Sequence, residues 1–246
     1  MSTSDDAPIG QILTRRDVLA SFGAAGAALL TLNASRPAVE PTPAAVCVVR
    51  PAQVEGPYFV DEKLERSDIR SDPTTRVLSP GAPLLLGFRV SRLVRGLCAP
   101  LSGATVDVWH CDALGVYSDE RDQDARFDSR GKKFLRGYQT TNRAGVVRFV
   151  TIYPGWYEGR AVHIHFKIRT AGSSGKHHDF TSQLYFNDTL SDRVHARAPY
   201  ATKGKGRLPN AADDIFRDQH GEELVLNATR RGGGYSALFD IAVALD

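Results

Sequence analysis

The sequence predicts an all-β fold, an antiparallel β-sandwich with long loops and few short helices. Short apolar segments recur about every dozen residues, and clusters of Gly, Pro, Asn and Asp separate them. Only one segment has the composition of a helix. A hydrophobic content of 42% and a charged content of 24% are those of a soluble globular protein. The candidate strands are residues 83–94, 104–111, 134–141, 146–153, 161–169, 180–186, 223–229 and 235–243.

The N-terminal part of the chain is predicted to lie outside this domain, which we place at residues 47–246. Residues 1–34 have the pattern of a twin-arginine-type signal segment, because Arg15 and Arg16 precede an apolar run too short for a comfortable membrane span. Residues 35–46, rich in Pro and Ala, have the composition of a linker. We therefore expect export to the periplasm or the extracellular space, with no stable membrane insertion afterwards. An apolar helix that stays attached is the alternative.

Two connections inside the domain have local signals. Asn142–Gly145, with the sequence NRAG, is predicted to be a hairpin turn between the candidate strands 134–141 and 146–153. Residues 210–219 form the one segment that we expect to be helical, with Asn210 or Asp213 as its N-cap.

The three cysteines, Cys47, Cys98 and Cys111, leave two interpretations open. In an exported protein they allow one disulfide and one free thiol. Three buried, inert thiols are the other possibility. The sequence has no C-x-x-C pair, so the cysteines match no zinc pattern, and we assign them no catalytic role.

The charge distribution argues against a nucleic-acid partner. The net charge is only +3, and the basic runs Lys203–Arg207 and Arg130–Lys133 lie among glycines. No stripe of basic and aromatic residues accompanies them. We interpret both runs as solvated loops.

The stretch GWYEGRAVHIHFKI contains the first indication of a functional site. In its second half Val162, Ile164 and Phe166 alternate with polar residues, which is the period of a strand with unlike faces. His163 and His165 therefore point the same way, with Cα atoms about 6.5 Å apart. Two imidazoles so placed can share one metal ion, but they can equally be polar residues on a wet face.

Two tyrosines extend this pattern. Tyr157 lies in a Gly/Pro loop just before the histidines, and Tyr117 follows another candidate strand at a turn that contains glycine. A phenol with a pKa near 10 ionises only beside a strong local charge. Two phenolates favour a trivalent over a divalent ion, whereas zinc and copper prefer imidazole, thiolate or carboxylate ligands. The set of four side chains therefore favours ferric iron.

Together with neighbouring motifs, these residues resemble the intradiol ring-cleavage dioxygenase family. The chain is most similar to exported, single-chain relatives of the protocatechuate 3,4-dioxygenase β subunit, from about residue 47 to the C-terminus. The resemblance implies a β-sandwich enzyme with non-haem Fe(III). The motifs that carry it are EGPYF (55–59), DVWHCDALGVYS (107–118), TIYPGWY (151–157), GRAVHIHF (159–166) and TSQLYF (181–186).

The resemblance also implies roles for individual residues. The metal ligands would be Tyr117, Tyr157, His163 and His165, with Tyr157 and His165 axial. Arg160 would lie beside the substrate ring. Gln183 would lie next to the metal ligands and support them without binding the metal. Pro57 and Tyr58 would help to wall the substrate pocket.

The activity that the resemblance implies is the cleavage of a catechol by O2 between its two hydroxyl-bearing carbons, which gives a cis,cis-muconate-type product. The catechol would bind through both oxygens and displace a hydroxide and Tyr157, which leave with its two protons. Arg160 would stabilise negative charge that develops on the ring. Iron would act as a Lewis acid and a template.

Two departures from the family bear on the range of substrates and on the oligomeric state. Only Glu158–Val162 separates Tyr157 from His163, a much shorter loop than in the family's well-known members, so we expect a more open site that admits bulkier or polymer-attached catechols. The N-terminal helical dimerisation region of the catechol 1,2-dioxygenase branch is also missing. The sequence leaves open whether the protein is a homo-oligomer. It also leaves open the choice among protocatechuate, catechol, hydroxyquinol and bulkier rings.

Two further interpretations belong to other functional classes. The chain could be an exported β-sandwich binding module without catalysis, although such a module has no need for all four candidate ligands and Arg160. It could also be a zinc or copper hydrolase, which is weakened because the sequence around the histidine pair offers no evident carboxylate base.

Overall fold

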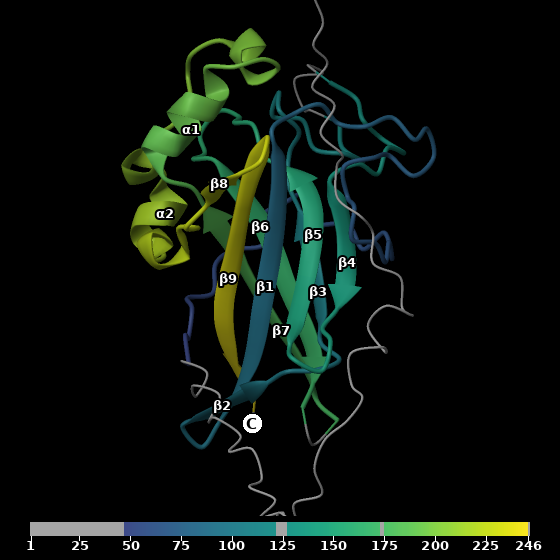
Figure 1. Cartoon of the computed structure of the whole chain (residues 1–246), viewed down its shortest axis with the longest axis vertical. Coiled ribbons are helices and arrows are strands. Elements are labelled where there is room, and N and C mark those ends of the chain that lie inside the picture. The colour runs from purple at the N-terminus through teal and green to yellow at the C-terminus, as the bar shows by residue number, and fades with distance from the viewer. Residues whose placement is uncertain (1–46, 122–126, 173–174, 246) are drawn as a thin grey trace, which may run out of the picture. The chain divides into compact units, whose positions relative to one another are not determined.

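Two β-sheets packed face to face form the domain in a computed structural model, which describes residues 47–121, 127–172 and 175–245 (Figure 1). The predicted β-sandwich is confirmed. The expected signal segment, residues 1–34, and the expected linker, residues 35–46, lie outside the described residues. Within the described ranges, no helix has the length and apolar character needed to cross a membrane.

The two sheets have different strand topologies. In the five-stranded sheet β1 is the central strand. β9 pairs with one side of β1, and on the other side β5 pairs with its first half and β2 with its last residues. Its strands are β1 (Pro83–Val94), β2 (Leu97–Pro100), β5 (Val146–Ile152), β8 (Thr229–Arg231) and β9 (Gly234–Ala244). In the four-stranded sheet the order is β4 (Arg136–Thr140), β3 (Thr105–Trp109), β6 (His163–Ala171) and β7 (His177–Tyr185).

The sandwich is not wholly antiparallel as predicted, because β1 and β9 pair in parallel from Leu84↔Tyr235 to Leu93↔Ala244. The other ladders between described strands are antiparallel. A parallel pair needs a long crossover connection, and here most of the chain lies between the two strands.

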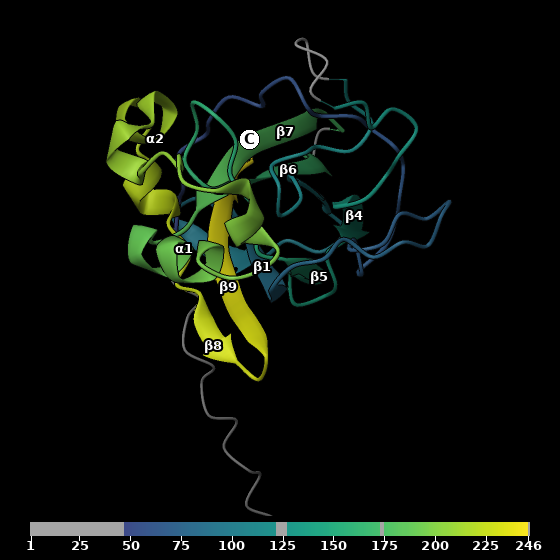
Figure 2. The same ribbon diagram turned by 90° about the horizontal axis from the view of Figure 1, so that it is seen from above.

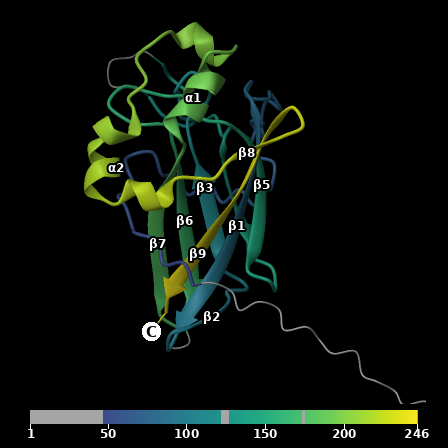
Figure 3. The ribbon, with the colours of Figure 1, turned by 60° about the vertical axis from the view of Figure 1, so that its left-hand side comes forward.

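The core lies between the sheets, where alternate residues of each strand meet. Phe88 of β1 is fully buried, with its ring 5.2 Å from that of Phe166 on β6 and 6.1 Å from that of Phe239 on β9. Because side chains alternate along a strand, the residues that flank Phe166 point to the outer face of the four-stranded sheet. His165 is one of them. Figures 2 and 3 show the two layers from above and from the side.

The predicted hairpin at Asn142–Gly145 is wrong, although the turn itself exists. The Asn142 side chain accepts hydrogen bonds from the amides of Ala144 and Val146, which shapes the turn. The strands on either side do not pair with each other, because β4 joins β3 and β5 joins β1. The turn therefore carries the chain from one sheet to the other.

The predicted strand at residues 223–229 is also wrong. Gly221–Leu224 forms a 3₁₀ turn, and only Val225 makes an isolated bridge, to Tyr185. Leu224 and Leu226 are buried in the core, so their alternation reflects packing without a ladder. The regular strand in this region is β8, which starts at Thr229.

Two helices lie on one side of the sandwich, close to one end of it (Figures 1 and 3). The sequence analysis missed α1 (Asp188–His195), which Asn187 caps by accepting a hydrogen bond from the Leu190 amide. The predicted helix at 210–219 is confirmed in part, as a 3₁₀ turn at Asn210–Ala212 followed by α2 (Asp214–Asp218), with Asp213 as the N-cap.

Two of the three cysteines form a disulfide, and the third is a free thiol. Cys47 and Cys98 form a disulfide that ties the first described residue to β2. Cys111 is free and buried, and its burial raises the pKa of the thiol, which keeps it protonated.

Candidate active site

The candidate site lies on the outer face of the four-stranded sheet, at the end where β3 and β5 finish and β6 begins. Figures 1 and 3 show α1 near this end and α2 on the same side of the sandwich. His165 pairs in register with Trp109 on one side and with Gln183 on the other. His163, at the start of β6, pairs with Tyr185. Loops cover this end of the face, so both histidines are at least 98% buried.

The histidine pair has the geometry that its spacing predicts. The His163 and His165 rings meet at 83°, and their Nε2 atoms are 3.0 Å apart. The Nδ1 atom of His163 lies 2.7 Å from the Ala161 carbonyl. Because a carbonyl only accepts hydrogen bonds, Nδ1 carries the proton, and Nε2 presents its lone pair to the site.

The two tyrosines come from loops that follow strands. Tyr117 ends a loop after β3 that Asp112 shapes, since its carboxylate accepts hydrogen bonds from the amides of Leu114 and Val116. Tyr157 lies in the loop between β5 and β6. Gly155 holds the two loops together: its amide bonds to the Asp112 carbonyl at 3.0 Å, and a Cβ there would lie 2.5 Å from that oxygen.

All four side chains converge on one point. The Tyr117 hydroxyl lies 3.3 Å, and the Tyr157 hydroxyl 3.1 Å, from Nε2 of His163. With the His165 nitrogen at 3.0 Å, three polar atoms surround a single lone pair. Hydrogen bonding can satisfy only one of these contacts at a time, because Nε2 of His163 has one lone pair.

The donor set fits a metal ion. Two ligand atoms at right angles on a metal, each about 2.1 Å from it, are about 3.0 Å apart. Burial lowers the pKa of both imidazoles well below the ordinary value, so they stay in the neutral form that binds metals. Burial also raises the pKa of Tyr117 and of Tyr157, so these phenols ionise only if a cation is present.

The segment that contains Gly56 and Tyr58, which precedes β1, covers the site. Gly56 has φ +75°, and a Cβ there would lie 3.2 Å from the His165 ring, so only a glycine passes comfortably at this point. Tyr58 stacks on Tyr117, with ring centroids 4.2 Å apart. Pro57, which lies between Gly56 and Tyr58 in the sequence, is exposed. The structure therefore places the two predicted pocket residues at the rim of the site.

Arg160 is held by a network of buried groups. Its Nε donates to the Asp213 carboxylate at 3.0 Å, and one Nη donates to the Gln183 side-chain oxygen at 2.6 Å. The same Nη lies 3.4 Å from the Tyr185 hydroxyl. Gln183 is fully buried and donates in turn to the Val54 carbonyl. For the other Nη the described residues supply no hydrogen-bond partner.

Several residues at the site were missed from the sequence. Asp213 was considered only as a helix cap, and Tyr185 and Gln53, joined by a 3.0 Å hydrogen bond, were not singled out at all. Arg136 of β4 is buried and donates to the carbonyls of Tyr58 and Ser118, so it fastens together the two segments that carry the stacked tyrosines. An arginine at the third position of the predicted strand 134–141 gives no sequence signal of such contacts.

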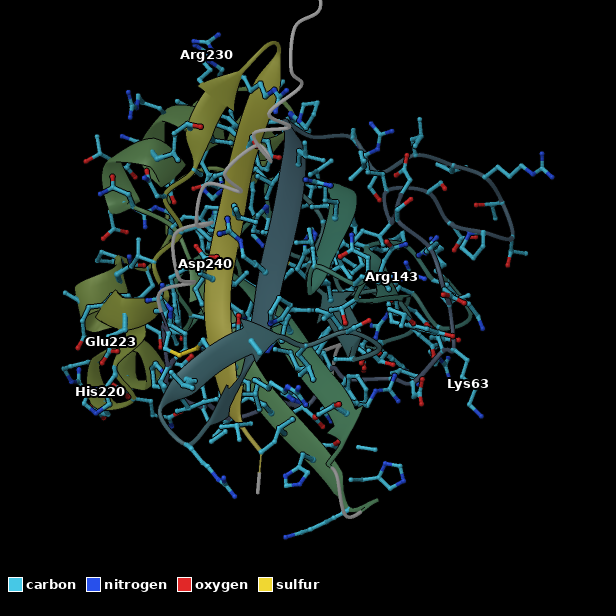
Figure 4. All side chains as sticks on the ribbon, turned by 60° about the horizontal axis from the view of Figure 1, so that its bottom comes forward. Lys63, Arg143, His220, Glu223, Arg230 and Asp240 are labelled. Atoms are coloured by element: carbon cyan, nitrogen blue, oxygen red, sulfur yellow. A yellow bond between two sulfur atoms is a disulfide. The ribbon has the colours of Figure 1, made fainter. Side chains whose placement is uncertain are left out.

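Other candidate groups differ from this site in their surroundings. His110 is buried between the sheets, where its ring bonds to the Cys111 carbonyl and the Thr151 hydroxyl, in agreement with a structural role. A second cluster of potential metal ligands is His220, Glu222 and Glu223, but all three side chains are exposed. Figure 4 labels His220 and Glu223. Among the described residues, only the tyrosine–histidine group combines burial with convergence.

Comparison with known proteins identifies related sequences. A family model described as "Dioxygenase" matches residues 54–208. The chain is 28% identical over 163 residues to chlorocatechol 1,2-dioxygenase from Pseudomonas sp. (strain P51), which covers 56% of this chain and 55% of the relative. It is 31% identical over 119 residues to catechol 1,2-dioxygenase from Candida albicans, a match that covers 39% of this chain and 36% of the relative. The match thus spans about half or less of these relatives.

Solved structures extend the match to most of the chain. An intradiol ring-cleavage dioxygenase from Tetranychus urticae superposes with a TM-score of 0.69 at 28% identity, covering 80% of this chain and 95% of that one. The dioxygenase domain of a dioxygenase carbohydrate-binding protein fusion from Streptomyces sp. SirexAA-E gives a TM-score of 0.56 at 28% identity, with 81% and 100% covered.

Proposed function

The chain belongs to the intradiol ring-cleavage dioxygenase family, and from this premise we propose that it cleaves a catechol-type ring with O2 between the two hydroxyl-bearing carbons. The product would be of the cis,cis-muconate type. The observation that carries the proposal is the convergence of two phenols and two imidazoles at 3.0–3.3 Å around Nε2 of His163, with Arg160 nearby.

The proposed cofactor is non-haem Fe(III), held by Tyr117, Tyr157, His163 and His165. The donor set supports this choice, since two phenolates and two neutral imidazoles suit a hard trivalent cation better than a divalent one. When bound, the ion would supply Lewis acidity and hold both substrate oxygens.

Tyr157 is the ligand best placed to exchange with substrate. It is partly exposed, whereas Tyr117 is 98% buried. A Tyr157 phenolate that leaves the ligand set can accept a proton from the catechol. Burial raises the pKa of Tyr157, so this hydroxyl keeps the proton once it has it.

Arg160 supplies positive charge next to the reacting ring. Its side chain is only 16% exposed, and three buried groups fix its orientation. A fixed cation in a poorly solvated site stabilises developing negative charge without the cost of reorganising water. The Nη group for which the described residues supply no partner is available to the substrate.

The range of substrates is proposed to include bulky catechols. Only five residues, Glu158–Val162, connect Tyr157 to His163, and Glu158 and Gly159 are exposed at the surface. This short connection supports an open entrance that admits substituted or polymer-attached rings. Ring substituents as different as a carboxylate and a hydroxyl remain compatible with it.

Export by a twin-arginine-type signal remains part of the proposal. The disulfide between Cys47 and Cys98 supports it, because disulfides persist in oxidising compartments and are rare in the cytosol. A folded enzyme that acquires its metal before transport would suit the twin-arginine route.

The test is oxygen consumption with catechol, protocatechuate and hydroxyquinol, with the product identified by mass spectrometry. We expect one O2 consumed per ring, and both oxygen atoms of ¹⁸O2 in the product. Tyr117→Phe should abolish turnover, and the control Tyr138→Phe, on the same sheet face, should not. Catechol binding without oxygen uptake by iron-loaded protein would favour the binding-module interpretation and overturn the proposal.

A further inference from the structure

Asp213 is a buried carboxylate to which the proposed mechanism assigns no chemical step. It stands between the 3₁₀ turn Asn210–Ala212 and α2, and its side chain is 1% exposed. One carboxylate oxygen, Oδ1, accepts hydrogen bonds from the amides of Ile215 at 2.9 Å and Phe216 at 3.3 Å. These contacts make Asp213 the N-cap of α2, which accounts for one of its two oxygens.

The other oxygen faces the candidate active site. Oδ2 accepts a hydrogen bond from Nε of Arg160 at 3.0 Å and another from the Ala161 amide at 2.7 Å. Capping a helix requires only one acceptor oxygen, and a serine would serve equally well. The second pair of hydrogen bonds, from a buried guanidinium and from the Ala161 amide, is therefore a separate function of this side chain.

We propose that Asp213 is a positioning residue that fixes Arg160 for the reaction; this inference rests on the proposed function. Asp213 occupies Nε, and Gln183 with Tyr185 occupies one Nη group, so the guanidinium plane is held along two sides. A planar guanidinium held at two edges cannot rotate. The remaining Nη group is thereby kept for the substrate.

The same contact also supports the histidine strand. The Ala161 amide bonds to Asp213, and the Ala161 carbonyl accepts a hydrogen bond from Nδ1 of His163 at 2.7 Å. One carboxylate thus anchors the backbone that carries Arg160 and orients His163. It links the start of α2 to two members of the site, although 53 residues separate it from Arg160 along the chain.

The decisive variant is Asp213→Ser, because serine retains the cap of α2 and is too short to reach Arg160. The matched control is Asn187→Ala, which removes the cap of α1 and touches no residue of the site. In Asp213→Ser we expect kcat to fall about 10- to 100-fold, with KM changed less than about threefold. In Asn187→Ala both constants should stay as in the wild type.

A double-mutant cycle separates positioning from general damage. If Asp213 acts mainly through Arg160, adding Asp213→Ser to Arg160→Ala should cause a much smaller further loss of kcat than Asp213→Ser causes in the wild type. The inference is overturned if Asp213→Ser lowers kcat by the same factor in both backgrounds, or if it leaves kcat unchanged.

A second measurement does not depend on turnover. In the metal-free full-length protein, the Nε–H group of Arg160 should give a protected ¹⁵N–¹H NMR signal, assigned by its loss in Arg160→Ala. The signal should persist in Asn187→Ala and vanish in Asp213→Ser; its persistence in Asp213→Ser would overturn the inference. If the wild type cleaves no ring, the proposed function fails, and this signal still decides whether Asp213 positions Arg160.

Discussion

The outer faces of the two sheets carry similar side chains but differ in how far they are enclosed. Each has an arginine–aspartate pair with nearly the same N–O distance: Arg160–Asp213 at 3.0 Å and Arg89–Asp240 at 3.1 Å. The first pair has side chains that are 16% and 1% exposed, and the second has side chains that are 47% and 42% exposed. Figure 4 shows Asp240 on β9, at the surface of the five-stranded sheet.

The difference shows how an alternating strand becomes a functional site. On both sheets, every second residue points outward. Around the start of β6 the outward residues are covered, and there a charge is less screened by water. Burial therefore gives Arg160 and His163 properties that Arg89, on the open face, does not have.

The largest expected effect comes from removing a proposed metal ligand. His163→Ala should lower kcat by at least about 1,000-fold and release iron on dialysis, because the site loses the nitrogen on which the other three donors converge. The control is His177→Ala, an exposed histidine on β7 of the same sheet. Iron retained at the wild-type level in His163→Ala would show that His163 is not a ligand.

The two arginines provide the next test. Arg160→Ala should reduce kcat about 100- to 1,000-fold, as does the loss of one group that stabilises transition-state charge. Arg89→Ala should leave kcat unchanged and shift the free energy of unfolding by less than about 1 kcal/mol, because its ion pair is exposed. Steady-state kinetics give kcat for each variant, and urea unfolding gives its free energy of unfolding. Equal losses of kcat in the two variants would contradict the contrast between buried and open faces.

The disulfide should affect stability and leave catalysis alone. It lies at β2, at the opposite end of the sandwich from α1 (Figure 1). The variant Cys47→Ser/Cys98→Ser should lose about 2–4 kcal/mol in the free energy of unfolding, with kcat per folded molecule unchanged. Reductant should destabilise the wild type and have no effect on the variant. A fall in kcat would mean that this end of the sandwich communicates with the site.

The buried His110 predicts a smaller, pH-dependent effect between the two sheets. Burial lowers its pKa from 6.5 to about 4. Between these values the unfolded chain binds the extra proton, so stability decreases as the pH falls below 6.5. From about pH 7.5 to pH 5 this amounts to about 2 kcal/mol. Urea unfolding of His110→Gln should show a correspondingly flatter pH dependence, and an unchanged slope would contradict the assignment.

Local patterns predicted the strands and the histidine pair because they depend on neighbours in the sequence. β1 occupies the predicted residues 83–94, and the alternation around His163 and His165 placed both imidazoles on one face. Helix α1 could have been found from Asn187 as a cap, with Leu190 and Val194 one turn apart. The sequence did contain that signal.

Contacts between distant segments could not be predicted in this way. The turn at Asn142 has an ordinary hairpin composition, and only the pairing of β5 with β1 shows that it connects two sheets. Likewise, Asp213 has a recognisable capping position, but its bond to Arg160 depends on how α2 packs beside β7. The roles of Tyr117 and Tyr157 came from the family resemblance, since a loop tyrosine alone indicates no ligand.

The central proposal is that Tyr117, Tyr157, His163 and His165 bind ferric iron, and the visible absorption spectrum with iron analysis tests it most directly. We expect about one iron per chain and a broad phenolate-to-iron charge-transfer band. Catechol added without oxygen should shift the band to the red, and Tyr157→Phe should weaken it, while the control Tyr138→Phe should not. A colourless protein that nevertheless contains one iron per chain would contradict the account.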